Sequence, residues 1–137
     1  MKLLIIVLLF TSISNAQPTP ALLTATIGTK HPALLLAMAK VESNYDMAKV
    51  GALGERGMLQ LRPELHGFYA LSTDHFQAAD RYLLQLRKQC SKLGQAWFIC
   101  YNYGPTAGRR VDNPTKTKYY IKVMEALREV HSRWPLL

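Results

Sequence analysis

The sequence predicts a single, mainly α-helical domain of five to six short helices. The chain has 137 residues, a length that accommodates one domain. Apolar residues recur at the three- and four-residue spacing of helices in several segments, and no convincing pair of alternating strands appears. The clearest helical stripe consists of Phe76, Ala79, Leu83 and Leu86. Because the chain has neither an internal repeat nor a low-complexity tract, we expect one folded unit.

Residues 1–16 have the pattern of a signal peptide. Lys2 supplies a positive start, residues 3–10 are all apolar, and small residues lead to a cleavage position at Ala16. The apolar run is far shorter than the ~20 residues that a membrane span needs. We therefore expect cleavage after Ala16 and an exported domain, residues 17–137, without a stable membrane span. An uncleaved N-terminal anchor is the alternative.

The N-terminal half of the expected domain contains two helices and a glycine-rich loop. A Pro-rich stretch at residues 17–20 precedes a weakly helical segment, residues 21–27. Pro32 suits the first turn of a second helix that reaches about Tyr45. Three glycines then break the periodicity, which predicts a loop or a small irregular sheet. They are Gly51, Gly54 and Gly57. The apolar pattern resumes over residues 58–65.

The C-terminal half contains the remaining helices. One starts near Asp74 and carries the apolar stripe given above. Gly94 separates it from an apolar segment, residues 96–103, which stops at a Gly-Pro pair. Asn113 before Pro114 is a good start signal for the last helix. The apolar stripe expected on that helix consists of Tyr120, Met124, Leu127, Val130 and Trp134.

The chain is basic, with a formal net charge of +8 at pH 7. Such a charge favours anionic polymers, namely nucleic acid, membrane lipid or bacterial cell wall. Charge alone does not choose among these partners, and solubility alone would also account for it. The Lys and Arg residues are scattered along the expected helices rather than gathered on one face, which disfavours a nucleic-acid or membrane binder.

Two cysteines, Cys90 and Cys100, follow the signal peptide. Disulfides form and persist in exported chains, and a bridge here would close a short loop and stabilise the fold by roughly 2–3 kcal/mol. The alternative is two separate buried thiols, because free cysteine behaves as a small apolar residue. No histidine pair at ligand spacing accompanies them, so we expect no zinc or other metal site.

Glu42 lies at the end of an apolar helix and borders its apolar face. It falls on one helical row with Leu35, Met38 and Tyr45. Because partial burial disfavours a charged carboxylate, we expect its pKa to be raised. A carboxyl group that keeps its proton near neutral pH can act as a general acid, as glycosidases require. The alternative is a glutamate whose stem packs while its head group reaches solvent.

Four short motifs follow one another along the chain. The first is Glu-Ser at a helix end, Glu42-Ser43. The second is Gly-x-x-Gly-x-x-Gln-x-x-Pro, present as Gly54, Gly57, Gln60 and Pro63. The third is an apolar helix with Tyr-Asn and then Gly-Pro, present as Tyr101-Asn102 and Gly104-Pro105. The fourth is Thr-x-x-Tyr before an aliphatic residue, present as Thr117, Tyr120 and Ile121.

With these motifs the chain resembles the catalytic domain of lytic transglycosylases, in the goose-lysozyme-like branch of the lysozyme superfamily. The resemblance runs from Pro32 to about Leu127, nearly the whole mature chain. It implies a single lysozyme-like domain, residues 17–137, with a glycine-rich loop beside an active-site cleft. It implies Glu42 as the single general acid and base. The substrate-binding residues that it implies are Ser43, Gln60, Tyr101, Asn102 and Tyr120.

The implied reaction cleaves peptidoglycan glycan strands between N-acetylmuramic acid and N-acetylglucosamine. The muramyl C6 hydroxyl attacks C1 and leaves a 1,6-anhydro end, so neither a second carboxylate nor a cofactor is called for. We expect a monomer in the periplasm or cell envelope. The pathway stays open among wall turnover, a secretion or conjugation machine, and phage entry.

Two departures from the family pattern bear on the sugar subsites of the expected cleft. Tyr103 stands where the family usually has a small residue, and Glu55-Arg56 puts two charges beside the expected cleft. Glu55 or Asp46 could be the second carboxylate of a hydrolytic muramidase. A non-catalytic wall-binding subunit of an export or conjugation apparatus is another alternative, although the intact motif residues disfavour it.

Overall fold

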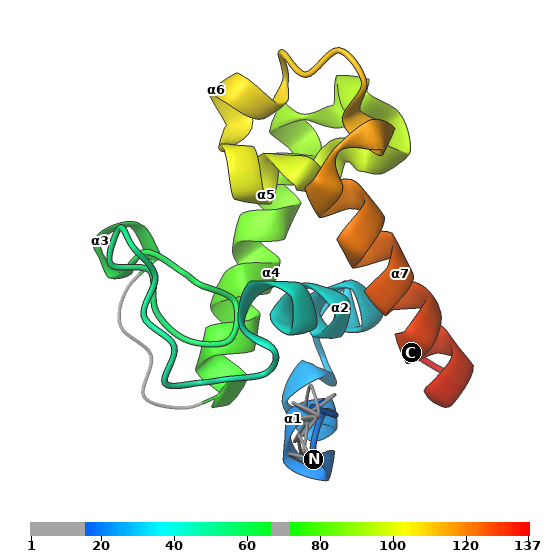
Figure 1. Cartoon of the computed structure of the whole chain (residues 1–137). Coiled ribbons are helices and arrows are strands. Elements are labelled where there is room, and N and C mark those ends of the chain that lie inside the picture. The colour runs from blue at the N-terminus through cyan, green and yellow to red at the C-terminus, as the bar shows by residue number, and fades with distance from the viewer. Residues whose placement is uncertain (1–15, 67–71) are drawn as a thin grey trace, which may run out of the picture.

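A short apolar helix, α2 (Pro32–Ser43), lies between α4 (Ser72–Gln89) and α7 (Lys118–Arg133) (Figure 1). The computed structural model describes residues 16–66 and 72–137. The predicted signal peptide, residues 1–16, thus lies outside the described residues except for its last position. In the two described ranges, no helix combines the length and the apolar character that crossing a membrane requires.

The sequence of α2 explains why it is buried. Pro32 occupies the first turn, where a missing N–H removes no helical hydrogen bond. Leu35, Leu36 and Met38 have no exposed surface, as expected for a helix that is apolar on most sides. The helix ends at Ser43, and Asn44 follows it with a φ of 55°, a left-handed conformation that asparagine adopts at helix ends.

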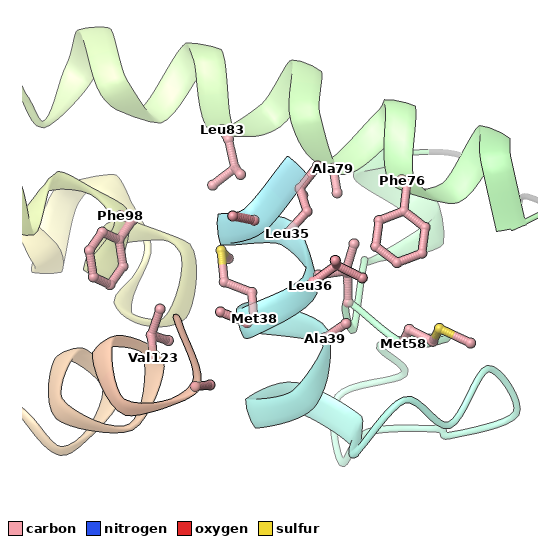
Figure 2. Packing of buried hydrophobic residues seen from close by; sticks show 14 of the residues in the cluster. Leu35, Leu36, Met38, Ala39, Met58, Phe76, Ala79, Leu83, Phe98 and Val123 are labelled. Atoms are coloured by element: carbon pink, nitrogen blue, oxygen red, sulfur yellow. The ribbon is translucent and has the colours of Figure 1, made fainter. Parts of the chain in front are cut away.

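Side chains from α4 and α7 pack on α2 from either side (Figure 2). On the α4 side, all four residues of the predicted stripe are fully buried, which confirms that prediction. Figure 2 shows Phe76 and Leu83 on that side, with Val123 of α7 and Phe98 on the other. Met58, from the loop that follows α2, closes one edge of this core.

Shorter elements complete the domain. The helix α1 (Pro20–Thr26) packs on α2 and α4, and its start is capped by Thr19, whose hydroxyl accepts the Leu22 N–H at 3.3 Å. The other elements are α3 (Pro63–His66), the 3-10 segment η1 (Ser91–Ile99), α5 (Cys100–Tyr103), α6 (Pro105–Gly108) and the 3-10 segment η2 (Pro114–Lys116).

Cys90 and Cys100 form a disulfide, with an S–S distance of 2.12 Å and a Cα–Cα distance of 6.8 Å. The bridge connects the end of α4 to the start of α5, and both cysteines are buried beside Leu86. Gly108 packs directly on it, because a Cβ atom there would lie 2.5 Å from the Cys100 sulfur. The disulfide therefore ties the helix that carries the Tyr-Asn motif to the end of α4.

The mainly helical prediction is confirmed, but two details of the helices were wrong. The described residues form seven α-helices and two 3-10 segments rather than five to six short helices, and α4 and α7 reach 18 and 16 residues. The last helix begins at Lys118, not at Pro114. Thr117 is extended and its hydroxyl accepts the Tyr120 N–H at 3.2 Å, whereas Asn113 makes no side-chain cap and starts η2.

The buried stripe of α7 also differs from the predicted one. Its buried residues are Tyr119, Val123, Ala126 and Val130. Tyr120, Met124 and Leu127 are only partly buried and pack at the edge of the core, as does Trp134, which follows the last residue of α7. The two stripes share Val130, and the other three buried residues each lie one position before a predicted one, because the helix presents the neighbouring row to α2. This shift changes which tyrosine faces the end of α2.

Candidate active site

The end of α2 and the first turn of α7 meet at Glu42. The Tyr119 hydroxyl donates a hydrogen bond of 2.8 Å to Oε1 of Glu42. Glu42 is half-buried, and Tyr119 is almost completely buried. Because α2 packs closely against α7, the packing of two helices holds this carboxyl group in one place.

The pKa of Glu42 is raised from its ordinary value, as its position on the helix predicted. The main cause is burial, which disfavours the charged carboxylate, and the charge of Glu55 adds to the effect. The Tyr119 hydrogen bond and the ammonium group of Lys49 act in the opposite direction without reversing the shift. Glu42 can therefore hold a proton at a higher pH than an exposed glutamate does.

Glu42 lines an open cleft of about 570 Å³ beside the end of α2. The cleft lies between the loop that follows α2 and residues of α4 and α5. Its polar and aromatic lining residues are Glu42, Lys49, Glu55, Gln60, Arg62, His66, Tyr82, Tyr101, Asn102 and Tyr103. Hydroxyl, amide and charged groups in this number suit a polar ligand with many hydrogen-bonding groups.

Gln60 holds the loop wall of the cleft in an unusual conformation. Its φ of 46° is left-handed, a conformation that costs energy in a residue with a Cβ atom. Its side-chain amide donates to the carbonyls of Gly57, at 2.8 Å, and Lys49, at 3.2 Å. Two backbone segments of the loop are thereby tied together, and the antiparallel bridges from Arg56 to Val50 and Leu61 do the same.

Gly57 is required at its position for two reasons. Its φ of 78° is left-handed, and a Cβ atom would lie 2.8 Å from the ring of His75. Only glycine permits both the turn and this close approach. The loop therefore rests directly on the first turn of α4.

The Tyr-Asn motif contributes to the opposite side of the cleft. The Tyr101 hydroxyl donates to the Leu59 carbonyl at 2.6 Å, so it is directed at the loop backbone. Burial, and then the nearby charge of Glu42, raise the pKa of Tyr101 well above its ordinary value, which keeps it a neutral donor. Asn102 and Tyr103 are exposed and also line the cleft.

Ser43 and Tyr120 do not line this cleft. Ser43 is buried at the end of α2, where its hydroxyl donates to the Ala39 carbonyl at 3.1 Å and accepts the Asp46 N–H at 3.1 Å. Tyr120 stacks on Phe98, with ring centroids 5.4 Å apart. The structure thus gives both residues contacts that support the helices beside Glu42.

Sequence reasoning missed Tyr119, which contacts Glu42. A signal for it was present, because Tyr119, Val123, Ala126 and Val130 also recur at helical spacing. The two overlapping stripes could be separated only by knowing which one faces α2.

Glu55 is a second carboxylate in the same cleft. Hydrogen bonds from the backbone N–H groups of Glu55 and Leu53 hold its pKa below the ordinary value, so it is ionised. The Leu53 bond is 2.9 Å long, and Arg62 lies 3.9 Å away. Asp46 is exposed, accepts the Ala48 N–H at 2.9 Å and does not line the cleft.

Neither a family model, nor a curated protein, nor a solved structure matches the chain. Any function assigned to the cleft must therefore be argued from its own residues and from the four sequence motifs. Within the two described ranges, no group of three or more His, Cys, Asp and Glu residues could hold a metal ion.

Proposed function

We propose that the protein is a peptidoglycan lytic transglycosylase in which Glu42 is the single general acid and base. The observation that carries the proposal is the position of Glu42, a half-buried carboxyl group with a raised pKa, held by Tyr119 in the wall of a polar cleft. Cleavage of a glycosidic bond needs such a protonated group beside its leaving oxygen. The motif residues Gln60 and Asn102 line the same cleft.

The proposed reaction consumes no water. Glu42 donates its proton to the oxygen between C1 of N-acetylmuramic acid and C4 of N-acetylglucosamine, and the bond from C1 to this oxygen breaks. The Glu42 carboxylate then takes the proton of the muramyl C6 hydroxyl as the C6 oxygen bonds to C1. The products are a free C4 hydroxyl and a 1,6-anhydro end, and Glu42 is protonated again for the next cycle.

The other cleft residues orient the glycan strand. Asn102 offers an amide donor and an acceptor to sugar hydroxyl and N-acetyl groups. Gln60 and Tyr101 hold the loop that forms the facing wall. Lys49 and Arg62 add positive charge to the cleft, which suits the carboxylates of the peptides attached to muramic acid.

The proposal includes the setting expected from the sequence. After removal of the signal peptide, the domain of residues 17–137 acts as a lysozyme-like monomer in the periplasm or cell envelope. Its partner is the glycan strand itself, and the chemistry needs no cofactor.

A hydrolytic muramidase is the second candidate, and Glu55 is the observation that favours it. The two carboxyl groups of the cleft have pKa values shifted in opposite directions, with Glu42 raised and Glu55 lowered. A protonated acid beside an ionised carboxylate is the arrangement that hydrolysing glycosidases use. In that reaction Glu55 would position a water molecule or attack C1 itself.

Both candidates require wall cleavage that depends on Glu42. Purified peptidoglycan would be incubated with residues 17–137 of the protein and its solubilisation measured. Glu42→Gln should reduce the rate by at least about 100-fold, because the amide has nearly the same shape but no acidic proton. The matched control is Glu125→Gln on an exposed part of α7, which should keep the rate. A protein that sediments with the wall but releases nothing would instead be a binding subunit.

A further inference from the structure

His75 is a buried residue behind the cleft that the proposed chemistry does not use. It lies in the first turn of α4 with only 3% of its surface exposed. Its ring meets Phe76 edge-on, with centroids 6.2 Å apart, and covers Gly57 of the loop. A buried imidazole brings polar nitrogen atoms into the interior, where an alkyl side chain would fill the space without them, so the hydrogen bonds of His75 call for an explanation.

The ring makes a defined hydrogen bond to the loop. The Leu59 N–H donates to Nε2 of His75 at 3.0 Å, in a buried position. Nε2 must therefore carry a lone pair rather than a proton. Burial lowers the pKa of His75 to about 4, so the imidazole stays neutral and keeps this acceptor at neutral pH.

Leu59 is held on both sides through its backbone. Its N–H is bound to His75 from the side of α4, and its carbonyl accepts the Tyr101 hydroxyl at 2.6 Å from the side of the cleft. The next residue is Gln60, in its left-handed conformation, with its amide on Gly57 and Lys49. The position of the Leu59 backbone is therefore linked to Tyr101 by a hydrogen bond and to Gln60 by the chain.

We propose that His75 is a positioning residue that fixes Leu59 and thereby sets Gln60 and Tyr101 for the bound glycan. The inference rests on the proposed function, because the placement of these two residues matters only if the cleft holds a sugar. His75 does not line the cleft. It acts through its hydrogen bond to the Leu59 N–H, next to the left-handed Gln60.

A pair of substitutions separates positioning from space filling. His75→Gln keeps an acceptor oxygen at about the reach of Nε2, whereas His75→Met has a similar length and volume but no comparable acceptor. Loss of a buried hydrogen-bond acceptor should change the rate or equilibrium that depends on it on the order of tenfold. We expect His75→Met to lower kcat for wall cleavage by about tenfold with a smaller change in KM, and to speed hydrogen exchange of the Leu59 amide about tenfold. His75→Gln should restore both quantities. Phe76→Leu, a core change that leaves the acceptor in place, should affect thermal stability but not kcat.

Hydrogen exchange of the Leu59 amide tests the role of His75 without any substrate. If the wild-type protein fails to cleave the wall, that result refutes the proposed function but not the hydrogen bond from Leu59 to His75. Equal impairment of the Gln and Met variants would overturn the positioning role, as would full protection and full kcat in His75→Met. If His75→Met does not fold, the ¹⁵N chemical shift of Nε2 in the wild-type protein shows whether Nε2 is the acceptor. An unprotonated Nε2 coupled to the Leu59 N–H supports the inference, and a protonated Nε2 contradicts it.

Discussion

The Tyr119 hydroxyl donates a hydrogen bond of 2.8 Å to Oε1 of Glu42 and joins α7 to the end of α2. Burial, the charge of Glu42 and this bond all raise the pKa of Tyr119 well above its ordinary value. Tyr119 is therefore a neutral donor at every pH at which the protein would act. The carboxyl group of the candidate acid is thus held by a partner that itself lies in the core, and the exposed Lys49 ammonium group donates to the backbone carbonyl of the same residue.

The first prediction concerns the pH dependence that Tyr119 imposes. The hydrogen bond favours the ionised carboxylate, so Tyr119→Phe should raise the pKa of Glu42 further. Glu42 would then keep its proton to higher pH, and the alkaline limb of the kcat/KM profile should move upward. The maximal rate should fall by about tenfold, because the carboxyl group loses a charge-assisted bond.

The control for this experiment is the adjacent tyrosine. Tyr120→Phe keeps the ring that stacks on Phe98 and removes no bond to Glu42, so the alkaline limb should stay in place. If Tyr120→Phe moved the limb and Tyr119→Phe did not, the account of how Glu42 is held would be wrong.

A second prediction uses Glu55, whose charge raises the pKa of Glu42. Glu55→Gln removes that charge, so the pKa of Glu42 should fall and the alkaline limb should move to lower pH. The maximal rate should stay within a few-fold, because Glu42 works alone in the proposed reaction. A loss of about 100-fold or more at all pH values would instead make Glu55 the second carboxylate of a muramidase.

A third prediction links His75 to stability in mild acid. Its pKa is about 4 in the folded protein, against 6.5 ordinarily. As the pH falls, the His75 imidazole is therefore protonated first in the unfolded chain. The stabilisation from keeping it neutral is complete above about pH 6.5 and is lost as the pH falls towards 4. Between pH 7 and 4.5 the free energy of unfolding should drop by about 2 kcal/mol from this group. Urea unfolding of wild type and His75→Gln would measure it, and equal pH slopes for the two would contradict it.

A fourth prediction concerns the disulfide. Replacing Cys90 and Cys100 together by alanine should lower the free energy of unfolding by about 2–3 kcal/mol. Cleavage well below the melting temperature should change little, because neither sulfur lines the cleft. Peptide mapping of the unreduced protein should give the linked pair, whereas two freely alkylated thiols would contradict the pairing.

The helices that could be predicted have strong local signals. The stripe of α4 is regular over four residues, and Pro32 marks the start of α2. The raised pKa of Glu42 also followed from its row on α2, because that row continues residues that are completely buried. In each case the information lies within one helix.

The details that could not be predicted depend on contacts between elements. Thr117 and Asn113 are both good helix starts by residue type, and the structure uses Thr117, so that Tyr119 in the first turn of α7 meets Glu42. The role of His75 depends on a loop sixteen residues earlier in the chain. The bridge between Cys90 and Cys100, by contrast, was predicted from two cysteines in a chain expected to be exported, and the structure confirms it.

The central claim is that Glu42 acts alone and that the sugar supplies its own nucleophile. The most direct test is the mass of the muropeptides that residues 17–137 release from purified peptidoglycan. Because the C6 hydroxyl displaces the leaving group and no water is added, the products should be one water lighter than those of a hydrolytic lysozyme and should lack new reducing ends. Hydrated products with ordinary reducing ends, in amounts that track the active protein, would contradict the account.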